Sequence, residues 1–380
     1  MKEIGVGIAG YGFIGKVHAY AYRNLPWFYD PAPARVRLVG VCTSRQETAD
    51  AARAQARFEF ATTDFGDLLR RDDIQVINLC TPNHLHKDEL LAAMAAGKHI
   101  YCDKPVTGNW AEAQAVAAAL PAYRGIHQMT LNYRFTNVAI RARQLIQDGF
   151  LGPITQFRVA YLHSGSVDPN KRMAWKQMAS AGGGVINDLG SHALDLVDWL
   201  IGPIAEVLAE TRMLYPQRPD PSGRLVAVEA EDAMTVLARL ANGGSGVVEA
   251  SKIATGADDE LRIEIHGARG ALRLNTMEPN HLEAYDASDP EMPFGGTRGW
   301  KSIATVDRFP KPGGWPGPKF TVGWLRSHVH CLYHFVSAVA EGRPASPSLR
   351  DGVRLQRLLD IVQCSARERA WRVVPREEIA

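Results

Sequence analysis

Short apolar runs alternate with helix-forming stretches along the first 125 residues of the chain. The apolar runs predict strands at residues 4–9, 36–41, 76–79 and 99–102. The stretches between and after them predict helices at residues 16–24, 47–57, 87–96 and 110–120. Strands that alternate with helices are typical of a parallel sheet with crossover helices. This part of the chain is therefore predicted to be an α/β domain.

The pattern changes at about Leu131. Longer β-rich stretches predict strands at residues 154–163, 204–214, 233–240, 246–253 and 261–266. Turn signals such as Asn242-Gly243-Gly244 beside these strands favour an antiparallel sheet, and hence a second, α+β domain. Residues 290–318 are rich in glycine and proline and predict an irregular loop, and helices at 325–341 and 349–369 close the chain. We expect two domains, residues 1–130 and 131–380.

The first strand runs directly into a glycine motif. Gly10, Gly12 and Gly15 have the spacing G-x-G-x-x-G, with Phe13 and Ile14 between the last two. In a strand–turn–helix, the first glycine permits the tight turn, the second lets the backbone approach a pyrophosphate and the third allows close helix packing. The helix N-terminus offers unpaired N–H groups to phosphates. These five residues are therefore predicted to bind a dinucleotide, with an ordinary glycine-rich loop as the alternative.

Composition and charge exclude several other classes. The 43 basic and 41 acidic residues nearly balance, which gives no reason to expect a nucleic acid or an anionic membrane as partner. Apolar stretches are shorter than the ~18 residues of a membrane span. The chain begins directly with a strand, so we expect no signal peptide. The five cysteines are scattered and form no C-x-x-C motif. Cys42, Cys80 and Cys102 each end an apolar, strand-like run, which predicts small buried residues in a reducing, cytoplasmic compartment.

Lys104 is the first candidate for catalysis. It follows the predicted strand at 99–102, and open α/β sheets bind ligands beyond the carboxyl ends of their strands. Pro105 restricts the backbone beside it. A lysine in this position can hydrogen-bond a substrate hydroxyl and take part in proton transfer. A solvated lysine in a turn is the alternative.

Asp188 and His192 form the second candidate site. They lie four residues apart after the run Gly182-Gly183-Gly184, so on a helix they would share one face. Histidine titrates near neutral pH, and oxidation of an alcohol requires removal of its proton. His192 is predicted to be that base, with Asp188 orienting it or binding a hydroxyl. A histidine packed inside a helix is the alternative.

Two further groups carry weaker signals. His330 and His334 have the i, i+4 spacing of metal ligands, but no carboxylate accompanies them. We expect them in a helix packed under the active site or at a subunit contact, and expect no metal. Tyr133, Trp175 and Trp324 are candidates to stack on a sugar, with burial in the core as the alternative.

Taken together, four motifs resemble the glucose–fructose oxidoreductase/inositol dehydrogenase/rhizopine catabolism (Gfo/Idh/MocA) family. They are the glycine motif, Thr81-Pro82-Asn83-x-x-His86, Asp103-Lys104-Pro105 and Asp188-x-x-x-His192. The resemblance covers nearly the whole chain, although the family's usual E-K-P is Asp-Lys-Pro here. It implies an N-terminal Rossmann domain and a C-terminal domain with a large open sheet. That sheet would form the contact of a homodimer or homotetramer.

The resemblance also implies an activity: oxidation or reduction of a secondary hydroxyl on a sugar, anhydrosugar or cyclitol. Thr81, Pro82, Asn83, His86 and Lys104 would contact the cofactor. Lys104 and His192 would handle the proton, and Lys104–Pro105 is expected to be a cis peptide. The substrate pocket would comprise Lys104, Tyr133, Arg134, Trp175, Asp188 and His192. The alternatives are a glycoside-cleaving enzyme that recycles a bound cofactor and a non-catalytic dinucleotide sensor.

The residues after the second strand bear on the choice of cofactor. NAD-specific folds usually place an acid there to bind the ribose hydroxyls. This chain has Cys42-Thr43-Ser44-Arg45, with no acid before Glu47. Because arginine suits phosphate geometry, Ser44 and Arg45 slightly favour NADP(H) over NAD(H). The alternative is that Arg45 stacks on adenine or points to solvent.

Overall fold

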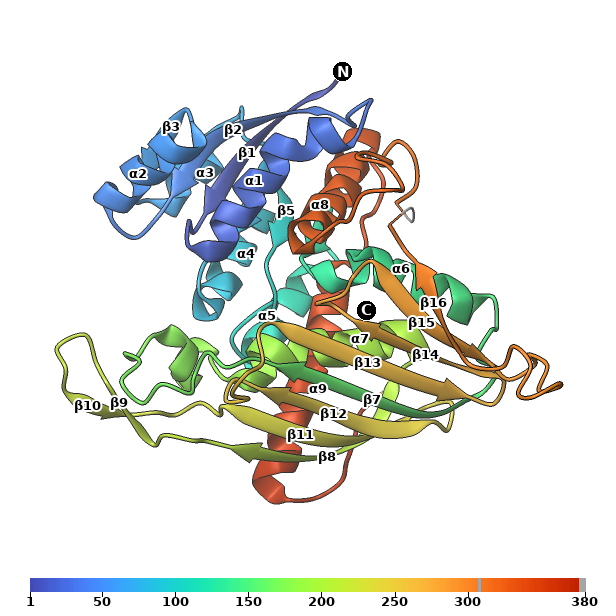
Figure 1. Cartoon of the computed structure of the whole chain (residues 1–380). Helices are drawn as coiled ribbons and strands as arrows, with labels where there is room; N and C mark the ends of the chain where they lie inside the picture. The colour runs from blue at the N-terminus through green and yellow to red at the C-terminus, as the bar shows by residue number, and fades with distance from the viewer. Residues whose placement is uncertain (307–308, 376–380) are drawn as a thin grey trace.

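The protein is described here from a computed structural model that defines residues 1–306 and 309–375. Two sheets lie at opposite ends of the molecule, with helices around the first and on one face of the second (Figure 1). The predicted α/β class is confirmed. No helix in these two ranges is long and apolar enough to cross a membrane.

The first domain is built on a six-stranded parallel sheet in the order β3-β2-β1-β4-β5-β6. Its strands are β1 (Glu3–Ala9), β2 (Arg35–Cys42), β3 (Phe60–Thr62), β4 (Val76–Leu79), β5 (His99–Cys102) and β6 (His127–Met129). Its helices are α1 (Phe13–Phe28), α2 (Gln46–Ala56), α3 (Phe65–Arg70), α4 (His86–Ala95) and α5 (Trp110–Ala119). The strand order reverses direction at β1 and β4, as in the Rossmann fold, so a crevice opens beyond the carboxyl ends of these two strands.

The second domain contains a nine-stranded sheet in the order β16-β15-β14-β13-β7-β12-β11-β8-β17. Its strands are β7 (Ile154–Leu162), β8 (Ile204–Arg212), β11 (Ala233–Leu240), β12 (Ser245–Ser251), β13 (Glu260–Gly267), β14 (Gly270–Asn275), β15 (His281–Asp286), β16 (Trp300–Ala304) and β17 (Arg372–Val373). A separate hairpin joins β9 (Gln217–Pro219) and β10 (Leu225–Ala227). The predicted mostly antiparallel sheet is confirmed. Within the described ranges, β7 and β12 form its one parallel pair.

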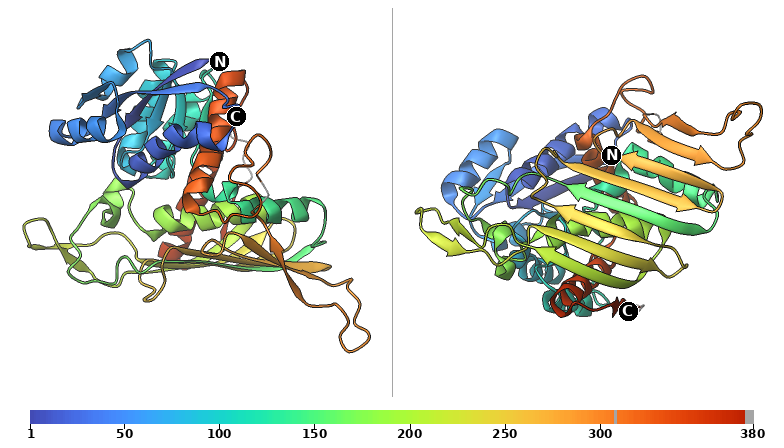
Figure 2. Two further views of the ribbon diagram at one scale, coloured as in Figure 1. Left: turned by 45° about the horizontal axis from the view of Figure 1, so that its top comes forward. Right: turned by 60° about the horizontal axis from the view of Figure 1, so that its bottom comes forward.

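One face of this sheet is covered by helices and the other is open. On the covered face lie α6 (Asn137–Gln147), α7 (Ser191–Ile201) and α9 (Leu349–Glu368). The second panel of Figure 2 looks onto the other face, over which no described helix lies. Side chains alternate accordingly: Met234 and Val236 of β11 are buried, whereas Thr235 and Leu237 are exposed.

Helix α8 (Trp324–Glu341) returns to the first domain although it belongs to the last part of the chain. It lies beside α1 (Figure 1), and its Val329 and Phe335 share a buried cluster with Ile4 and Ile8 of β1. The expected domains, residues 1–130 and 131–380, assign α8 to the second domain, although it packs against the first.

The expected irregular loop at 290–318 was wrong in part. Strand β16 lies inside it and pairs with β15, because Trp300–Ala304 extends the sheet edge despite the flanking glycines and prolines. Residues 307–308 of that loop lie outside the described residues. The predicted burial of Cys42, Cys80 and Cys102 is confirmed.

Candidate active site

A cavity of about 1160 Å³ lies between the two domains. Its lining extends from the glycine turn at Gly10 past Lys104 to His192, so the cavity is long enough to fit a dinucleotide with a small substrate beside it. Most of the residues expected at the site line it: Gly10, Gly12, Phe13, Ile14, Ser44, Thr81, Pro82, Asn83, Lys104, Tyr133, Trp175, Asp188 and His192. Four expected residues do not: Gly15, Arg45, His86 and Arg134.

The glycine turn leaves the N-terminus of α1 open to the cavity. Gly10 has φ +83°, and a Cβ on it would lie 2.5 Å from the carbonyl oxygen of Cys80. A Cβ on Gly15 would lie 2.3 Å from the carbonyl oxygen of Gly10. Gly12 caps α1 without a side-chain partner, and a Cβ on it would have no neighbour within 4 Å. This empty space beside free helix N–H groups fits the pyrophosphate of a dinucleotide.

The end of β2 presents neutral groups to the cavity. Cys42, Thr43, Ser44 and Thr48 line it, and the hydroxyls of Thr43 and Thr48 lie 2.7 Å apart. Arg45 is exposed at the N-terminus of α2 and does not line the cavity. Of the two residues on which the expectation of NADP(H) rested, Ser44 lines the cavity and Arg45 does not.

His86 supports the cofactor loops from behind. It is fully buried, and its Nδ1 and Nε2 lie 2.9 and 3.0 Å from the carbonyl oxygens of Pro105 and Thr81. Burial lowers the pKa of this imidazole. His86 thus ties the loop after β4 to the loop after β5 that carries Lys104.

Lys104 and Asp188 meet across the domain boundary. The Nζ of Lys104 donates to the backbone oxygen of Asp188 at 2.6 Å and to its Oδ1 at 3.1 Å. The Lys104–Pro105 peptide is cis, as the resemblance implied. The side chain of Lys104 is 13% exposed and faces the cavity lined by both domains.

Asp188 lies in a π-helical turn, not in a regular α-helix as the spacing predicted. The turn spans Ile186–Gly190 and leads into α7, which begins before His192. Ser191 Oγ donates to the carbonyl oxygens of Asn187 and Asp188, at 2.8 and 3.2 Å. These bonds, with the one from Lys104, occupy carbonyls that a regular helix would pair with backbone N–H groups. Wide turns of this kind often occur at functional sites.

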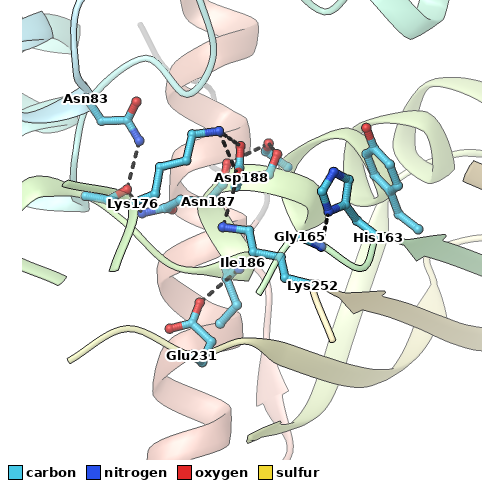
Figure 3. A network of polar contacts seen from close by, with 12 residues as sticks. Asn83, His163, Gly165, Lys176, Ile186, Asn187, Asp188, Glu231 and Lys252 are labelled. Atoms are coloured by element: carbon cyan, nitrogen blue, oxygen red, sulfur yellow. Dashed lines mark hydrogen bonds and ion pairs between the residues drawn. The ribbon is translucent and has the colours of Figure 1, made fainter. Parts of the chain in front are cut away.

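Three lysines surround the Asp188 carboxylate, and Figure 3 shows two of them, Lys176 and Lys252. Lys176 lies 3.0 Å and Lys252 2.9 Å from Oδ2, while Lys104 contacts Oδ1. Burial alone would raise the pKa of Asp188, but Lys252, Lys104 and Lys176 together hold it well below its ordinary value. Asp188 is therefore a carboxylate throughout the range in which the protein would work.

His192 is buried and neutral near pH 7. Burial lowers the pKa of its imidazole well below the ordinary value, and the charge of Lys104 lowers it further. Its ring packs edge-on against Tyr133, with centroids 4.8 Å apart. The hydroxyls of Tyr133 and Tyr161 both donate to Asp259, at 3.1 and 2.7 Å. A neutral imidazole held in this way can accept a proton from a ligand in the cavity.

Arg134 has a different role from the one expected. Its guanidinium forms a bidentate ion pair with Asp195, at 2.5 and 2.8 Å, and it does not line the cavity. Both partners are largely buried. The pair fixes the segment after β6 to α7, so Arg134 supports the neighbouring Tyr133 instead of lining the substrate pocket.

His330 and His334 lie in α8, and His330 contacts α1. The Nδ1 of His330 lies 2.5 Å from the hydroxyl of Tyr29 in α1, and its Nε2 lies 3.4 Å from that of His334. Among residues 1–306 and 309–375, no group of three or more His, Cys, Asp or Glu side chains could hold a metal ion.

Several cavity residues were not anticipated from the sequence. They are Tyr161, His163, Lys176, Lys252, Asp259 and His328. Only Lys252 gave a usable signal in the sequence. It lies near the end of the predicted strand at 246–253, directly after β12, and a lysine in such a place is rarely buried without a partner. The others follow strands or lie in loops whose spacing gave no indication of the cavity.

Comparison with known proteins identifies the family. Residues 4–130 match the family described as "Oxidoreductase family, NAD-binding Rossmann fold", and residues 139–273 match the GFO/IDH/MocA C-terminal domain. The chain belongs to the Gfo/Idh/MocA family. It is accordingly a nicotinamide dinucleotide-dependent dehydrogenase, and the family resemblance drawn from the four motifs is confirmed.

Relatives in the Gfo/Idh/MocA family cover the whole chain. Levoglucosan dehydrogenase of Pseudarthrobacter phenanthrenivorans is 33% identical, over 99% of both chains. Inositol 2-dehydrogenase of Rhizobium meliloti is 25% identical, over 96% of this chain and 97% of its own. A solved levoglucosan dehydrogenase in complex with NADH and levoglucosan superposes with a TM-score of 0.94, at 33% identity, over 99% of this chain and all of that one.

Proposed function

We propose that this protein oxidises a secondary hydroxyl of a sugar, anhydrosugar or cyclitol, or reduces the corresponding ketone. The observation that carries the proposal is the contact of Lys104 with Asp188 in one cavity with the buried, neutral His192. Similarity to a levoglucosan dehydrogenase and an inositol dehydrogenase supports this substrate class.

Lys104, Asp188 and His192 each have a separate role in the proposed reaction. A bound nicotinamide dinucleotide supplies the hydride acceptor or donor. In the oxidation direction, Lys104 donates a hydrogen bond to the reacting oxygen, and the neutral His192 accepts the hydroxyl proton as the O–H bond breaks and the carbonyl forms. Asp188 orients Lys104 and accepts a hydrogen bond from a neighbouring hydroxyl. In reduction, His192 returns the proton.

The adenosine end of the cofactor is proposed to lie against Ser44 and Thr43. These side chains are neutral and present no carboxylate that would repel a 2′-phosphate. Arg45 is exposed nearby rather than in the cavity wall. We therefore propose that the protein accepts NAD(H) and NADP(H) with little discrimination.

The open face of the nine-stranded sheet is the proposed subunit contact. Its strands present side chains such as Leu237 outward, with no described helix over them (Figure 2). We propose a homodimer or homotetramer formed through this face. Light scattering of the purified protein measures the oligomer mass, and a monomer would overturn this part.

The test of the function is the appearance of reduced nicotinamide. The protein is mixed with NAD⁺ or NADP⁺ and a panel of neutral and anionic polyols (levoglucosan, glucose, inositols, hexuronates and hexose 6-phosphates), and its absorbance is followed. A rise with one polyol supports the proposal. No rise with any of them, in protein that binds NADH by fluorescence, would overturn it and favour a glycoside-cleaving enzyme with a recycled cofactor.

A further inference from the structure

The wall of the cavity formed by the second domain carries a surplus of positive charge. Lys171, Lys176 and Lys252 all line it, together with His163. This side of the cavity lies across from the glycine turn and belongs to the substrate half of the site. A neutral sugar has no group that requires such a surplus.

The position of Lys252 and His163 is fixed by the sheet. They follow Ser251 of β12 and Leu162 of β7, which are register partners in the parallel pair. Their side chains therefore lie next to each other on one face, and Figure 3 shows both beside Asp188. The Nδ1 of His163 accepts the backbone N–H of Gly165 at 2.7 Å, which leaves the proton of the neutral ring on Nε2.

The lysines around Asp188 carry more N–H donors than there are protein oxygens beside them, in the described part of the chain, to accept hydrogen bonds. Each ammonium carries three N–H donors. Lys252 is 9% exposed, and within the described residues its one ionic partner is Asp188, at 2.9 Å. Asp188 must also serve Lys104 and Lys176. Three positive charges thus share one carboxylate at this point.

Other carboxylates offset only part of this charge. Asp259 lines the same wall, and Glu231 lies near Lys252, but burial raises the pKa of Glu231 and its Oε1 accepts the N–H of Ile186. Asp103 and Glu89 line the side of the cavity that the first domain forms, and burial raises the pKa of both carboxyl groups.

Both carboxylate oxygens of Asp259 accept hydrogen bonds from Tyr133 and Tyr161, which hold this acid beside His192. Behind the loop 163–172, the fully buried Arg218 donates to the carbonyl oxygens of Ser166 and Asp168. Within the described residues its hydrogen bonds go to these neutral oxygens, so its charge adds to that of the wall.

The neighbouring cations also affect Lys171, which lines the same wall. Burial lowers the pKa of this lysine, and the charges of Lys252, Arg218 and Lys176 lower it further, although Asp188 acts in the opposite direction. A positive potential that opposes protonation of a lysine attracts an anion. An anionic group on the substrate would supply the missing acceptors, since buried charges are favourable only when they are paired.

We infer that the substrate is a sugar or polyol that carries an anionic group, a carboxylate or a phosphate, which Lys252, Lys176 and His163 bind. Its reacting hydroxyl then faces Lys104 and His192. This inference rests on the proposed function and narrows its substrate class.

The first experiment compares matched neutral and anionic ligands. Glucose, galactose and mannose are each paired with the corresponding uronate and 6-phosphate. Calorimetric titration in the presence of NADH measures binding, and reduction of NAD⁺ and NADP⁺ measures turnover. We expect at least one anionic ligand to bind about tenfold or more tightly than its neutral partner. The uronate and phosphate arms show which anion fits.

Binding and turnover separate the two proposals. Tighter binding of an anion without any turnover supports the anion site and overturns the proposed oxidation of a sugar hydroxyl. Turnover in which every neutral sugar equals or exceeds its anionic partners overturns the anion site and leaves the function standing. Failure of every anionic ligand to bind overturns the anion site as well.

Lysine variants test which groups bind the anion. In Lys252→Met and Lys176→Met, the ratio of anionic to neutral affinity should fall about tenfold, and Lys252→Arg should restore much of it. Lys87→Met, which removes a lysine outside the cavity, is the matched control. An unchanged ratio in both methionine variants, with the fold intact by circular dichroism, would overturn the assignment.

Discussion

The Nζ of Lys104 lies 2.6 Å from the backbone oxygen of Asp188 and 3.1 Å from its carboxylate. Lys104 follows a strand of the Rossmann domain, whereas Asp188 belongs to the π-helical turn of the second domain. The contact therefore sets the distance between the two halves of the cavity at the point where chemistry is proposed. Each residue can work only while the domains keep this arrangement.

Replacement of Lys104 should separate chemistry from binding. We expect Lys104→Ala to lower kcat by about 10²- to 10⁴-fold, because the reacting oxygen loses its hydrogen-bond donor. NADH affinity should change little, since the glycine turn is untouched. Steady-state kinetics and NADH fluorescence measure the two effects, with Lys87→Ala as control. Turnover close to that of the wild type would contradict the assignment.

The glycine turn offers a matched pair of variants. A Cβ at position 12 meets no protein atom, so Gly12→Ala should fold normally but weaken dinucleotide binding, by about tenfold or more. A Cβ at position 15 would lie 2.3 Å from the carbonyl oxygen of Gly10, so Gly15→Ala should lower Tm. NADH titration and thermal unfolding distinguish them. If Gly12→Ala bound NADH like the wild type, the pyrophosphate would lie elsewhere.

Cofactor discrimination should depend on charge at the end of β2. The wild type is expected to bind NADH and NADPH within about tenfold of each other, because the cavity there is neutral. Ser44→Asp should weaken NADPH binding by at least about tenfold, through repulsion of the 2′-phosphate. Ser44→Asn has the same shape without the charge and should leave the ratio nearly unchanged. Equal losses of NADPH affinity in the two variants would indicate that the cause is steric and not the charge.

Buried histidines should make the fold sensitive to acid. Burial, and secondarily Arg343, lower the pKa of His334 to about 4 in the folded protein, against about 6.5 in an unfolded chain. The unfolded state therefore binds a proton that the folded state does not, so stability is lost as pH falls from about 6.5 towards 4. Burial lowers the pKa of His18 and His127 to about 4 as well.

Urea unfolding at several pH values tests this linkage. His334→Gln removes one titrating group. As pH is lowered near pH 5, the free energy of unfolding of this variant should therefore fall less steeply than that of the wild type, by about 1.4 kcal/mol per pH unit. The exposed His281→Gln is the control. Parallel pH profiles for the wild type and His334→Gln would show that His334 titrates alike in both states.

The sequence predicted the first domain well because its signals are local. Strong apolar runs marked β1, β2, β4 and β5, and the glycine spacing marked the turn into α1. The three-residue strands β3 and β6 were missed because such short segments carry no periodicity. They are strands because they pair with a neighbour already in place.

Contacts between distant segments were beyond the reach of the sequence. The family resemblance implied that Arg134 lines the substrate pocket like its neighbour Tyr133, but Asp195, 61 residues away, pairs with its guanidinium. Similarly, nothing local indicated that Lys252 meets Asp188. The motifs identified the residues nearest the chemistry, whereas the shape and charge of the surrounding wall depend on tertiary packing.

The return of α8 to the first domain also governs how the protein matures. The core around β1 and α1 includes Val329 and Phe335, which leave the ribosome some 200 residues after the Rossmann strands are complete. At synthesis rates of about 5 to 20 residues per second, this delay is roughly 10 to 40 s. During that time the nucleotide-binding half lacks one side of its core. Its final assembly is therefore coupled to the completion of nearly the entire polypeptide.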